Sequence, residues 1–252
     1  MNISALILTK NEEEMVEGCL KQLEFADEII LLDQGSTDNT VTLAKKYTTK
    51  IYSSGESGFD KNRNTLAKLA KGKWLLYLDA DERIDDMFVK ELKESLKKEE
   101  FSAFYVPRKN YVLGKRVKHG GWWPDYVPRV FKREDFLNWT GEVHETAHTR
   151  GSFGYFKSPI LHKSARSINL MMEKSIKWTK IEAMLNYKNG AKPVTVLTVL
   201  KSLFREFIIK YFLKAGFMDR TVGLTEAIYQ SLNQAIILTY LWELQNDSKK
   251  IS

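Results

Sequence analysis

Cysteine is almost absent from this chain of 252 residues, where Cys19 is the only one. A single cysteine excludes an internal disulfide and is typical of proteins of a reducing compartment. The sequence also lacks a charged N-terminal segment followed by an apolar one, so we expect no signal peptide. The longest uncharged stretch of the C-terminal part, residues 227–242, has 16 residues and includes Gln230 and Asn233. A spanning helix needs about 20 mostly apolar residues, so we expect no transmembrane segment.

Proline is scarce, with five in the chain, and most of them lie between residues 101 and 165. Before that region, short apolar runs alternate with helical spacing. We expect strands at residues 3–8, 28–32, 50–53 and 74–78, and helices at 12–23, 38–47, 60–71 and about 86–98, the first of them capped by Asn11. This alternation predicts an α/β fold with a parallel sheet covered by helices.

The composition changes twice along the chain. Residues 101–165 hold several tryptophans and many β-branched residues, which favours short strands and long loops, whereas helical spacing dominates after Ser167. We expect helices at 168–187, 193–215 and 219–245, with Pro193 in the first helical position. The sequence thus predicts two parts, residues 1–165 and 166–252, and a division of the first part near residue 100.

Charge is unevenly distributed. Residues 1–100 carry 15 Lys/Arg and 20 Asp/Glu, whereas residues 101–252 carry 24 and 12. A basic half of this kind suggests a phosphorylated substrate, anionic lipid or nucleic acid as a partner, and the alternative is a solvated lysine-rich surface.

Two carboxylates follow the most apolar of the expected strands. Residues 74–78 run directly into Asp79, Ala80 and Asp81. In open α/β sheets, ligands bind just beyond the carboxyl ends of the strands. Two acidic side chains there can hold a hard divalent cation, which in turn can hold a diphosphate. This pattern predicts a metal-dependent enzyme acting on a nucleotide-activated substrate, and the alternative is a helix-capping cluster ahead of Asp85.

Asp33 stands in the same position after the expected strand 28–32. A carboxylate there can accept a hydrogen bond from a base N–H or a ribose hydroxyl, and the alternative is a plain strand–turn–helix joint. Arg63, on the helix expected at 60–71, either faces a diphosphate or is an exposed helix arginine.

Six segments together carry a family resemblance. In chain order they are LTKNE (residues 8–12), LDQGSTD (32–38), KNRN (61–64), LDADE (78–82), VHE (143–145) and ILH (160–162). The chain resembles family 2 glycosyltransferases of GT-A fold, and within them the bacterial lipopolysaccharide-core β-glucosyltransferase group. This resemblance implies an α/β domain with a Rossmann-like mixed sheet flanked by helices, followed by a C-terminal amphipathic helical appendage. The chain departs from the residues usual in this family at Gln34 and at the pair Asp219-Arg220. The resemblance therefore does not specify the transferred sugar.

The resemblance implies a donor-binding half at residues 1–100 and an acceptor and metal half at 101–165. It implies that Asp33 recognises the base, that Asp79 lies near the ribose and metal, and that Asp81 binds Mg²⁺ or Mn²⁺ on the diphosphate. His162 is a further candidate ligand. The remaining donor-binding candidates are Thr9, Asn11, Arg63 and Arg129.

The implied reaction is inverting transfer from a nucleoside-diphosphate sugar, UDP-glucose or similar, to a cell-envelope glycan or glycolipid such as lipopolysaccharide core. A carboxylate must take the proton of the acceptor hydroxyl. We expect Glu145 to be this base, with Glu142 and Asp125 as rivals.

A competing motif overlaps the expected base. Residues 144–148 read HETAH and fit the H-E-x-x-H pattern of zinc peptidases. That pattern works only on a helix, where His144 and His148 share one face. The flanking residues favour strand or loop. Two further classes compete with a glycosyltransferase: a nucleotidylyltransferase, which would want a glycine-rich loop after the first strand, and a non-catalytic membrane-binding module.

The C-terminal part contains an apolar segment with a basic stripe. Between residues 194 and 213 most side chains are apolar, and Lys201, Arg205, Lys210 and Lys214 recur at helical spacing. Such a helix can lie in a membrane interface near anionic headgroups, or it can pack on the catalytic domain. We expect a cytoplasmic protein, peripheral at the inner face of the cytoplasmic membrane, with no nucleic-acid partner.

Overall fold

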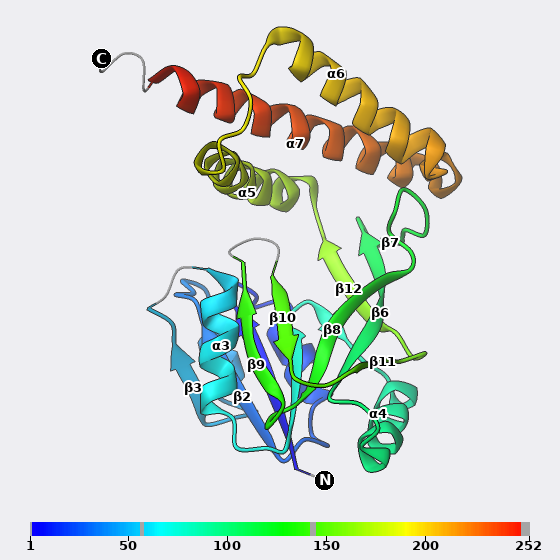
Figure 1. Cartoon of the computed structure of the whole chain (residues 1–252). Coiled ribbons are helices and arrows are strands. Elements are labelled where there is room, and N and C mark those ends of the chain that lie inside the picture. The colour runs from blue at the N-terminus through cyan, green and yellow to red at the C-terminus, as the bar shows by residue number, and fades with distance from the viewer. Residues whose placement is uncertain (1, 56–57, 142–144, 248–252) are drawn as a thin grey trace. The chain divides into compact units, whose positions relative to one another are not determined.

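The computed structural model describes residues 2–55, 58–141 and 145–247 (Figure 1). The chain forms two units. The first contains Met1–Arg108 and Asp125–His162, and the second contains Lys109–Pro124 and Lys163–Ser252. The boundary after His162 lies close to the one expected after residue 165. Residues 109–124, which the sequence places in the first part, belong to the second unit instead.

A parallel sheet forms the centre of the first unit. It contains β1 (Ile3–Thr9), β2 (Glu28–Asp33), β3 (Lys50–Ser53) and β4 (Trp74–Asp79), in the order β3-β2-β1-β4. All seven residues of β1 are buried. Alternate residues of β1 enter different apolar clusters, with Ile3, Ala5 and Ile7 in one and Leu6 and Leu8 in the other. Both faces of the sheet are therefore covered, as continuous apolar strands predict.

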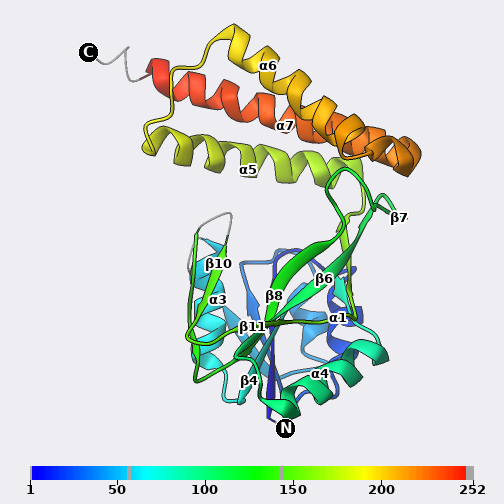
Figure 2. The same cartoon turned by 45° about the vertical axis from the view of Figure 1, so that its right-hand side comes forward.

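Further strands extend this sheet beyond β4, and most of their pairings are antiparallel. They are β8 (Asp125–Lys132), β6 (Ala103–Val112), β12 (Ile160–Ala165) and β5 (Glu82–Arg83), in that order, while β11 (Phe153–Tyr155) and β7 (Lys115–Arg116) pair with β6. A separate hairpin of β9 (Phe136–Thr140) and β10 (Thr146–Thr149) lies beside α3 (Phe59–Leu69) (Figures 1 and 2). The predicted α/β class, a mixed sheet flanked by helices, is confirmed.

The other helices of the first unit are shorter than expected, with one exception. They are α1 (Val16–Lys21), α2 (Thr40–Ala44) and α4 (Asp86–Lys98). Asp85 caps α4 by accepting from the Phe88 N–H at 2.9 Å. The expected cap of the first helix is wrong: Asn11 has a φ of 53° and lies ahead of α1, whose N-cap is Met15.

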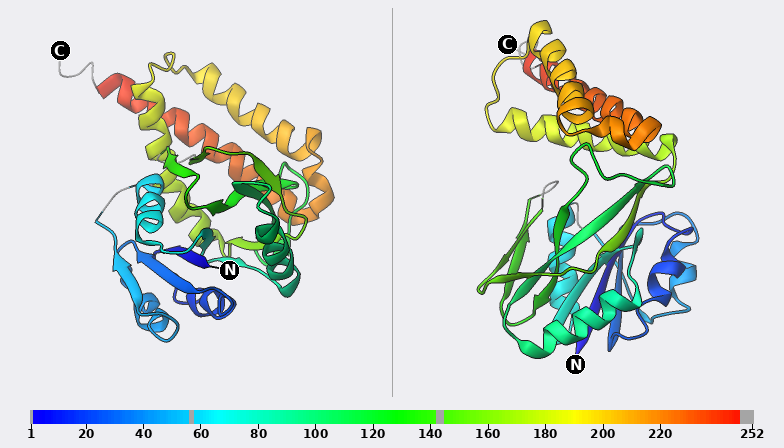
Figure 3. Two further views of the ribbon diagram at one scale, coloured as in Figure 1. Left: turned by 60° about the horizontal axis from the view of Figure 1, so that its bottom comes forward. Right: turned by 90° about the vertical axis from the view of Figure 1, so that its right-hand side faces the viewer.

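Helices make up most of the second unit. They are α5 (Ile168–Lys188), α6 (Val196–Phe207), a π-helix η1 (Ile208–Leu213), a 3₁₀ turn η2 (Gly216–Asp219) and α7 (Arg220–Asp247). Helix α7 packs against both α5 and α6 (Figure 3). Among the described residues, no helix combines the length and the apolar character needed to cross a membrane.

The start of α6 differs from the expectation. Pro193 does not occupy the first helical position, because Thr195 is the N-cap. The Thr195 hydroxyl accepts from the Thr198 N–H at 3.2 Å, and the Thr198 hydroxyl accepts from the Thr195 N–H at 2.8 Å. This reciprocal capping satisfies two backbone donors and defines the first turn two residues after the proline.

Candidate active site

Three strand ends bring the predicted donor-binding residues to one edge of the sheet. Thr9 is paired in register with Asp33 of β2, and Leu8 is paired with Asp79 of β4. Because these strands are parallel, Thr9, Asp33 and Asp79 lie at their common carboxyl edge, where α/β proteins bind ligands.

The loops after β1 and β2 are bound to each other. The Asn11 side-chain oxygen accepts from the Thr37 N–H at 2.8 Å, and the Asn11 N–H donates to the Ser36 hydroxyl at 2.8 Å. Asp33 accepts from the backbone N–H groups of Gly35 at 3.1 Å and Ser36 at 2.9 Å. The carboxylate thus closes its own turn, so a strand–turn–helix joint describes its present contacts well.

Asp79 lies between two buried arginines. Arg63 Nη2 donates to Asp79 Oδ1 at 3.0 Å, and Arg129 Nη2 donates to Asp79 Oδ2 at 2.7 Å. Burial alone would raise the pKa of Asp79, yet the charges of Arg129 and Arg63 outweigh it and hold that pKa far below the ordinary range. Asp79 is therefore ionised.

Two members of this cluster are not among the residues predicted from the sequence. Glu82 is fully buried and accepts from Arg129 Nη2 at 2.6 Å, and its other oxygen accepts from the Asp79 N–H at 3.1 Å. Arg108 Nη1 lies 3.8 Å from Glu82, and its Nη2 lies 2.9 Å from Asp125. Glu82 follows the Asp79–Asp81 pair directly, which is a usable signal, whereas nothing in the sequence marks Arg108.

Arg63 is held by aromatic rings as well as by charge. Its guanidinium carbon lies 5.8 Å from the ring centroid of Tyr77 and 5.2 Å from that of Trp139. Arg63 is 5% exposed, so it is not an exposed helix arginine, and its Nε and Nη1 have no hydrogen-bond partner within the described ranges. Two buried donors without acceptors fit an anionic ligand. Trp139 itself is buried and packs on Tyr77 and Phe131 as part of the core.

Asp81 and His162 come together from distant parts of the sequence. The antiparallel pairing of β12 with β5 aligns His162 with Glu82. His162 Nε2 consequently lies 3.6 Å from Asp81 Oδ2. Two ligands that each lie about 2.1 Å from one cation are separated by a distance of this order.

These residues fit a divalent cation in part. No set of three or more His, Cys, Asp or Glu side chains suited to a metal ion occurs in residues 2–55, 58–141 and 145–247. Asp81 and His162 are two donors, which matches ions that complete their shell with substrate phosphate and water. Both oxygens of Asp79, by contrast, already accept from arginines.

The expected base, Glu145, lies in the electrostatic field of the same cluster. Its pKa is raised, mainly because burial disfavours the charged form and also because Asp79 is near, while Arg63 and Arg129 oppose the shift. The rival Asp125 is paired through two contacts with Arg108, at 3.0 and 2.9 Å. The other rival, Glu142, lies outside the described residues.

The competing zinc-peptidase motif lacks the helix that it needs, as the flanking residues indicate. Residues 146–149 form β10 instead of a helix, so the spacing of four residues does not put His148 on a helical face. His148 Nε2 instead lies 2.9 Å from the Thr140 hydroxyl on the neighbouring strand. His144 lies outside the described residues.

Comparison with known proteins shows which family the chain belongs to. It is 25% identical over 255 residues to the lipopolysaccharide core biosynthesis glycosyltransferase LpsC of Rhizobium meliloti, covering 93% of this chain and 91% of LpsC. It is 25% identical over 242 residues to an uncharacterized glycosyltransferase of Rickettsia bellii, covering 85% and 79%. A solved structure, S. aureus TarS 1-349 in complex with UDP-GlcNAc, is 13% identical with a TM-score of 0.49, covering 99% and 92%. The profile of Glycosyl transferase family 2 matches residues 4–159. Since this match spans more than half of the chain, the protein belongs to glycosyl transferase family 2 and is a glycosyltransferase.

Proposed function

We propose that the protein transfers a sugar from a nucleoside-diphosphate sugar, UDP-glucose or a similar donor, to a hydroxyl of a cell-envelope glycan or glycolipid such as lipopolysaccharide core. The transfer inverts the anomeric configuration. One observation carries the proposal: Asp79, held by Arg63 and Arg129, stands beside Asp81 at the carboxyl edge of the parallel strands. The acceptor class is supported by the similarity to LpsC.

The donor occupies the loops after β1, β2 and β4. Asp33 recognises the base, with Thr9 and Asn11 beside it, and Asp79 lies near the ribose. The buried guanidinium of Arg63, which has two donors to spare, and that of Arg129 neutralise the diphosphate. Buried cations oriented before the reaction stabilise the charge that develops on a leaving group without reorganising.

Asp81 and His162 would hold the divalent cation, Mg²⁺ or Mn²⁺, with Asp79 close by. When bound, the cation supplies further charge stabilisation for the departing nucleoside diphosphate. A histidine ligand suits Mn²⁺ better than Mg²⁺.

Glu145 is the general base. Its raised pKa makes it a better proton acceptor than an ordinary glutamate once it is ionised. It takes the proton of the acceptor hydroxyl as the oxygen attacks the anomeric carbon and the bond to the diphosphate breaks. The enzyme works as a peripheral protein at the inner face of the cytoplasmic membrane, where a glycolipid acceptor would lie.

Thermal unfolding with a panel of nucleotide sugars tests this function. A donor at about 100 times its Kd stabilises the native state by about 2.7 kcal/mol, which raises the Tm by roughly 5–10 °C. We expect this shift with UDP-sugars in the presence of Mn²⁺ or Mg²⁺. Asp81→Asn should abolish the part of the Tm increase that depends on the cation. Asp86 is an exposed residue of α4, so Asp86→Asn should leave the Tm increase unchanged.

Two results would contradict the proposal. If no nucleotide sugar raises the Tm, the donor assignment fails. If Asp81→Asn keeps the full cation requirement, Asp81 is not a metal ligand. Turnover of the donor upon addition of a lipopolysaccharide-core acceptor then tests the reaction itself.

A further inference from the structure

The second unit, which we call the helical unit, carries most of the exposed large hydrophobic side chains among the described residues. Of the 24 large hydrophobic side chains that are exposed in the described residues, 19 belong to the second unit and five to the first. The second unit is the smaller one in residue number. Scattered exposed apolar residues are normal, but such a concentration marks an interaction surface.

Most of the buried residues of helices α5, α6 and α7 are small or polar. Besides Met171, Ile237 and Leu241, the buried residues of α5, α6 and α7 are Ser175, Thr179, Ala183, Ser202, Gly223, Glu226, Ala227 and Ser231. Hydrogen bonds join the helices: the Ser175 hydroxyl donates to Asn233 Oδ1 at 2.6 Å, and Tyr229 donates to the Met171 carbonyl at 2.7 Å. Helices in lipid pack in this way, through small residues and interhelical hydrogen bonds, with large apolar side chains outward.

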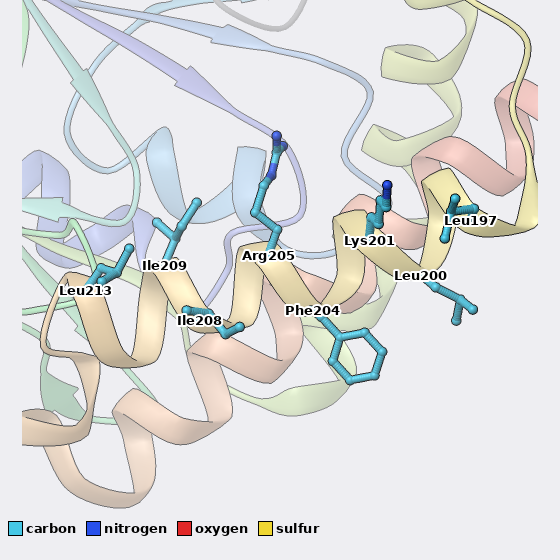
Figure 4. Close-up of a pocket in the computed structure, with 8 residues that line it drawn as sticks. All are labelled: Leu197, Leu200, Lys201, Phe204, Arg205, Ile208, Ile209 and Leu213. Carbon is cyan, nitrogen blue, oxygen red and sulfur yellow. The ribbon is translucent and has the colours of Figure 1, made fainter.

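Helix α6 and the π-helix η1 show this arrangement, with small residues buried and large apolar side chains exposed, most clearly. Ser202 is the only buried residue of α6, whereas Val196 is 78% exposed, Phe204 62% and, on η1, Leu213 76%. Figure 4 shows Leu200 and Phe204 directed to one side of α6, and Lys201 and Arg205 to another. We call the set Leu200, Phe204 and Ile208, which are exposed and point to the same side in Figure 4, the α6 apolar face.

Charge identifies the occupant of this face. The second unit carries 18 Lys/Arg and 7 Asp/Glu, a net charge of +11. Lys201 and Arg205 flank the α6 apolar face (Figure 4). Apolar side chains bordered by cations match the acyl chains and the phosphate headgroups of an anionic leaflet at the same time.

We propose that the helical unit inserts into one leaflet of an anionic phospholipid bilayer, with the α6 apolar face among the acyl chains and Lys201 and Arg205 at the headgroups. The inference rests on the peripheral location of the proposed function and names the surface that provides it. The insertion is monotopic, because no helix in the described part of the chain is suited to cross the bilayer.

Site-directed labelling measures the depth of insertion. The chain has one cysteine, Cys19, and it is fully buried, so a cysteine introduced at the surface is labelled selectively. Phe204→Cys and the control Met87→Cys, whose native side chain is 72% exposed on α4 of the first unit, each receive a spin label. With vesicles of phosphatidylcholine and phosphatidylglycerol, the label at 204 should become accessible to oxygen and shielded from a water-soluble relaxation agent. The label at 87 should remain in water.

Measurements of vesicle binding by substituted variants provide a second test of the proposed insertion. The double variant L200Q/F204Q should bind these vesicles at least about tenfold more weakly than the unaltered protein, because two anchoring side chains lose their apolar contacts. M87Q should bind as the unaltered protein does. Vesicles of phosphatidylcholine alone should bind all three more weakly.

The outcomes separate this inference from the proposed function. Labels at 204 that stay water-accessible on vesicles overturn it, and so does a label at 204 that is shielded in solution by dimerisation without lipid. Donor-induced thermal stabilisation is measured on L200Q/F204Q in parallel and should persist. Loss of insertion with donor stabilisation intact refutes only the docking surface, whereas insertion without donor stabilisation refutes only the function.

Discussion

Asp79, Glu82, Arg63 and Arg129 form a network of charges from which water is largely excluded. Burying ions is costly, and the cost is offset only when each charge has a partner at close range. Arg129 is shared between two carboxylates, at 2.7 Å from Asp79 and 2.6 Å from Glu82, and their charges raise its pKa in spite of burial. Each side chain is therefore fixed in position before a ligand arrives.

Removing Arg129 should destabilise the fold. Arg129→Met removes the shared partner of Glu82, whose carboxylate is fully buried, and of Asp79, whose side chain is 27% exposed. We expect a loss of about 3–5 kcal/mol in the free energy of unfolding. Urea denaturation measures it. The matched control is Lys46→Met, which breaks an exposed pair with Glu17 and should cost about 0–1 kcal/mol. Equal losses in the two variants would show that the cluster contributes no special stability.

Glu145→Gln should lower kcat by about 10²–10⁴-fold, because the acceptor hydroxyl loses its proton acceptor. Asp125→Asn is the matched test of the rival and should have a much smaller effect, since Asp125 is engaged by Arg108. A greater loss in Asp125→Asn would reverse the assignment.

The pH dependence of kcat/KM provides an independent check on Glu145. A base works only when deprotonated, and the pKa of Glu145 is raised. The rate should therefore increase with pH through a pKa above that of an ordinary glutamate, and this limb should vanish in Glu145→Gln. A profile without an acidic limb above the ordinary glutamate range would contradict Glu145 as the base.

Among the elements, α7 approaches the preceding turn so closely that one of its residues must be glycine. A Cβ on Gly223 would lie 1.9 Å from the carbonyl oxygen of Gly216. Helix propensity alone favours alanine over glycine by about 1 kcal/mol. Steric overlap with a backbone atom outweighs this preference, so alanine at position 223 should lower the stability.

Gly223→Ala should accordingly destabilise the helical unit by about 1–3 kcal/mol, as overpacking does elsewhere. Chemical denaturation followed by circular dichroism measures the change. Leu224→Ala, at the neighbouring exposed position of α7, keeps the helix propensity high and should change the stability little. A stabilising Gly223→Ala would mean that α7 and the turn can separate at no cost.

For the whole molecule, charge is divided between the units. The first unit carries 21 Lys/Arg and 25 Asp/Glu, while the second has a net charge of +11. Attraction between a basic surface and anionic headgroups is screened over about 10 Å at 0.1 M salt and over about 3 Å at 1 M. Binding to vesicles that contain phosphatidylglycerol should therefore weaken steeply as sodium chloride is raised. Flotation assays measure this, and affinity that is independent of salt would leave no role for the basic residues.

Much of the first unit could be predicted from the sequence, because its signals are local. Strand 50–53 is found at the expected residues, and the helix expected at about 86–98 is α4. The predicted start of the helix at 12–23 is wrong, because Asn11 accepts a hydrogen bond from Thr37 of the next loop and does not cap the helix. Propensity describes neighbours in sequence and misses such contacts between loops.

The candidate site was predicted in part for the same reason. Asp33 and Asp79 follow apolar strands, and parallel pairing puts both at one edge. The partners of Asp79 come from α3 and β8, and no periodicity marks Arg129 as one of them. Glu145 has its shifted pKa only through burial and the distant charges of Asp79, Arg63 and Arg129.

By itself the sequence determined that buried strands end in acidic residues and that a basic, apolar helical segment follows, because these properties depend on residue type and spacing alone. Only the tertiary structure decided that Arg63 and Arg129 occupy both oxygens of Asp79, that His162 reaches Asp81, and that the helices bury serine while exposing phenylalanine. Those facts depend on which strands pair and which faces pack, and long-range contacts fix both.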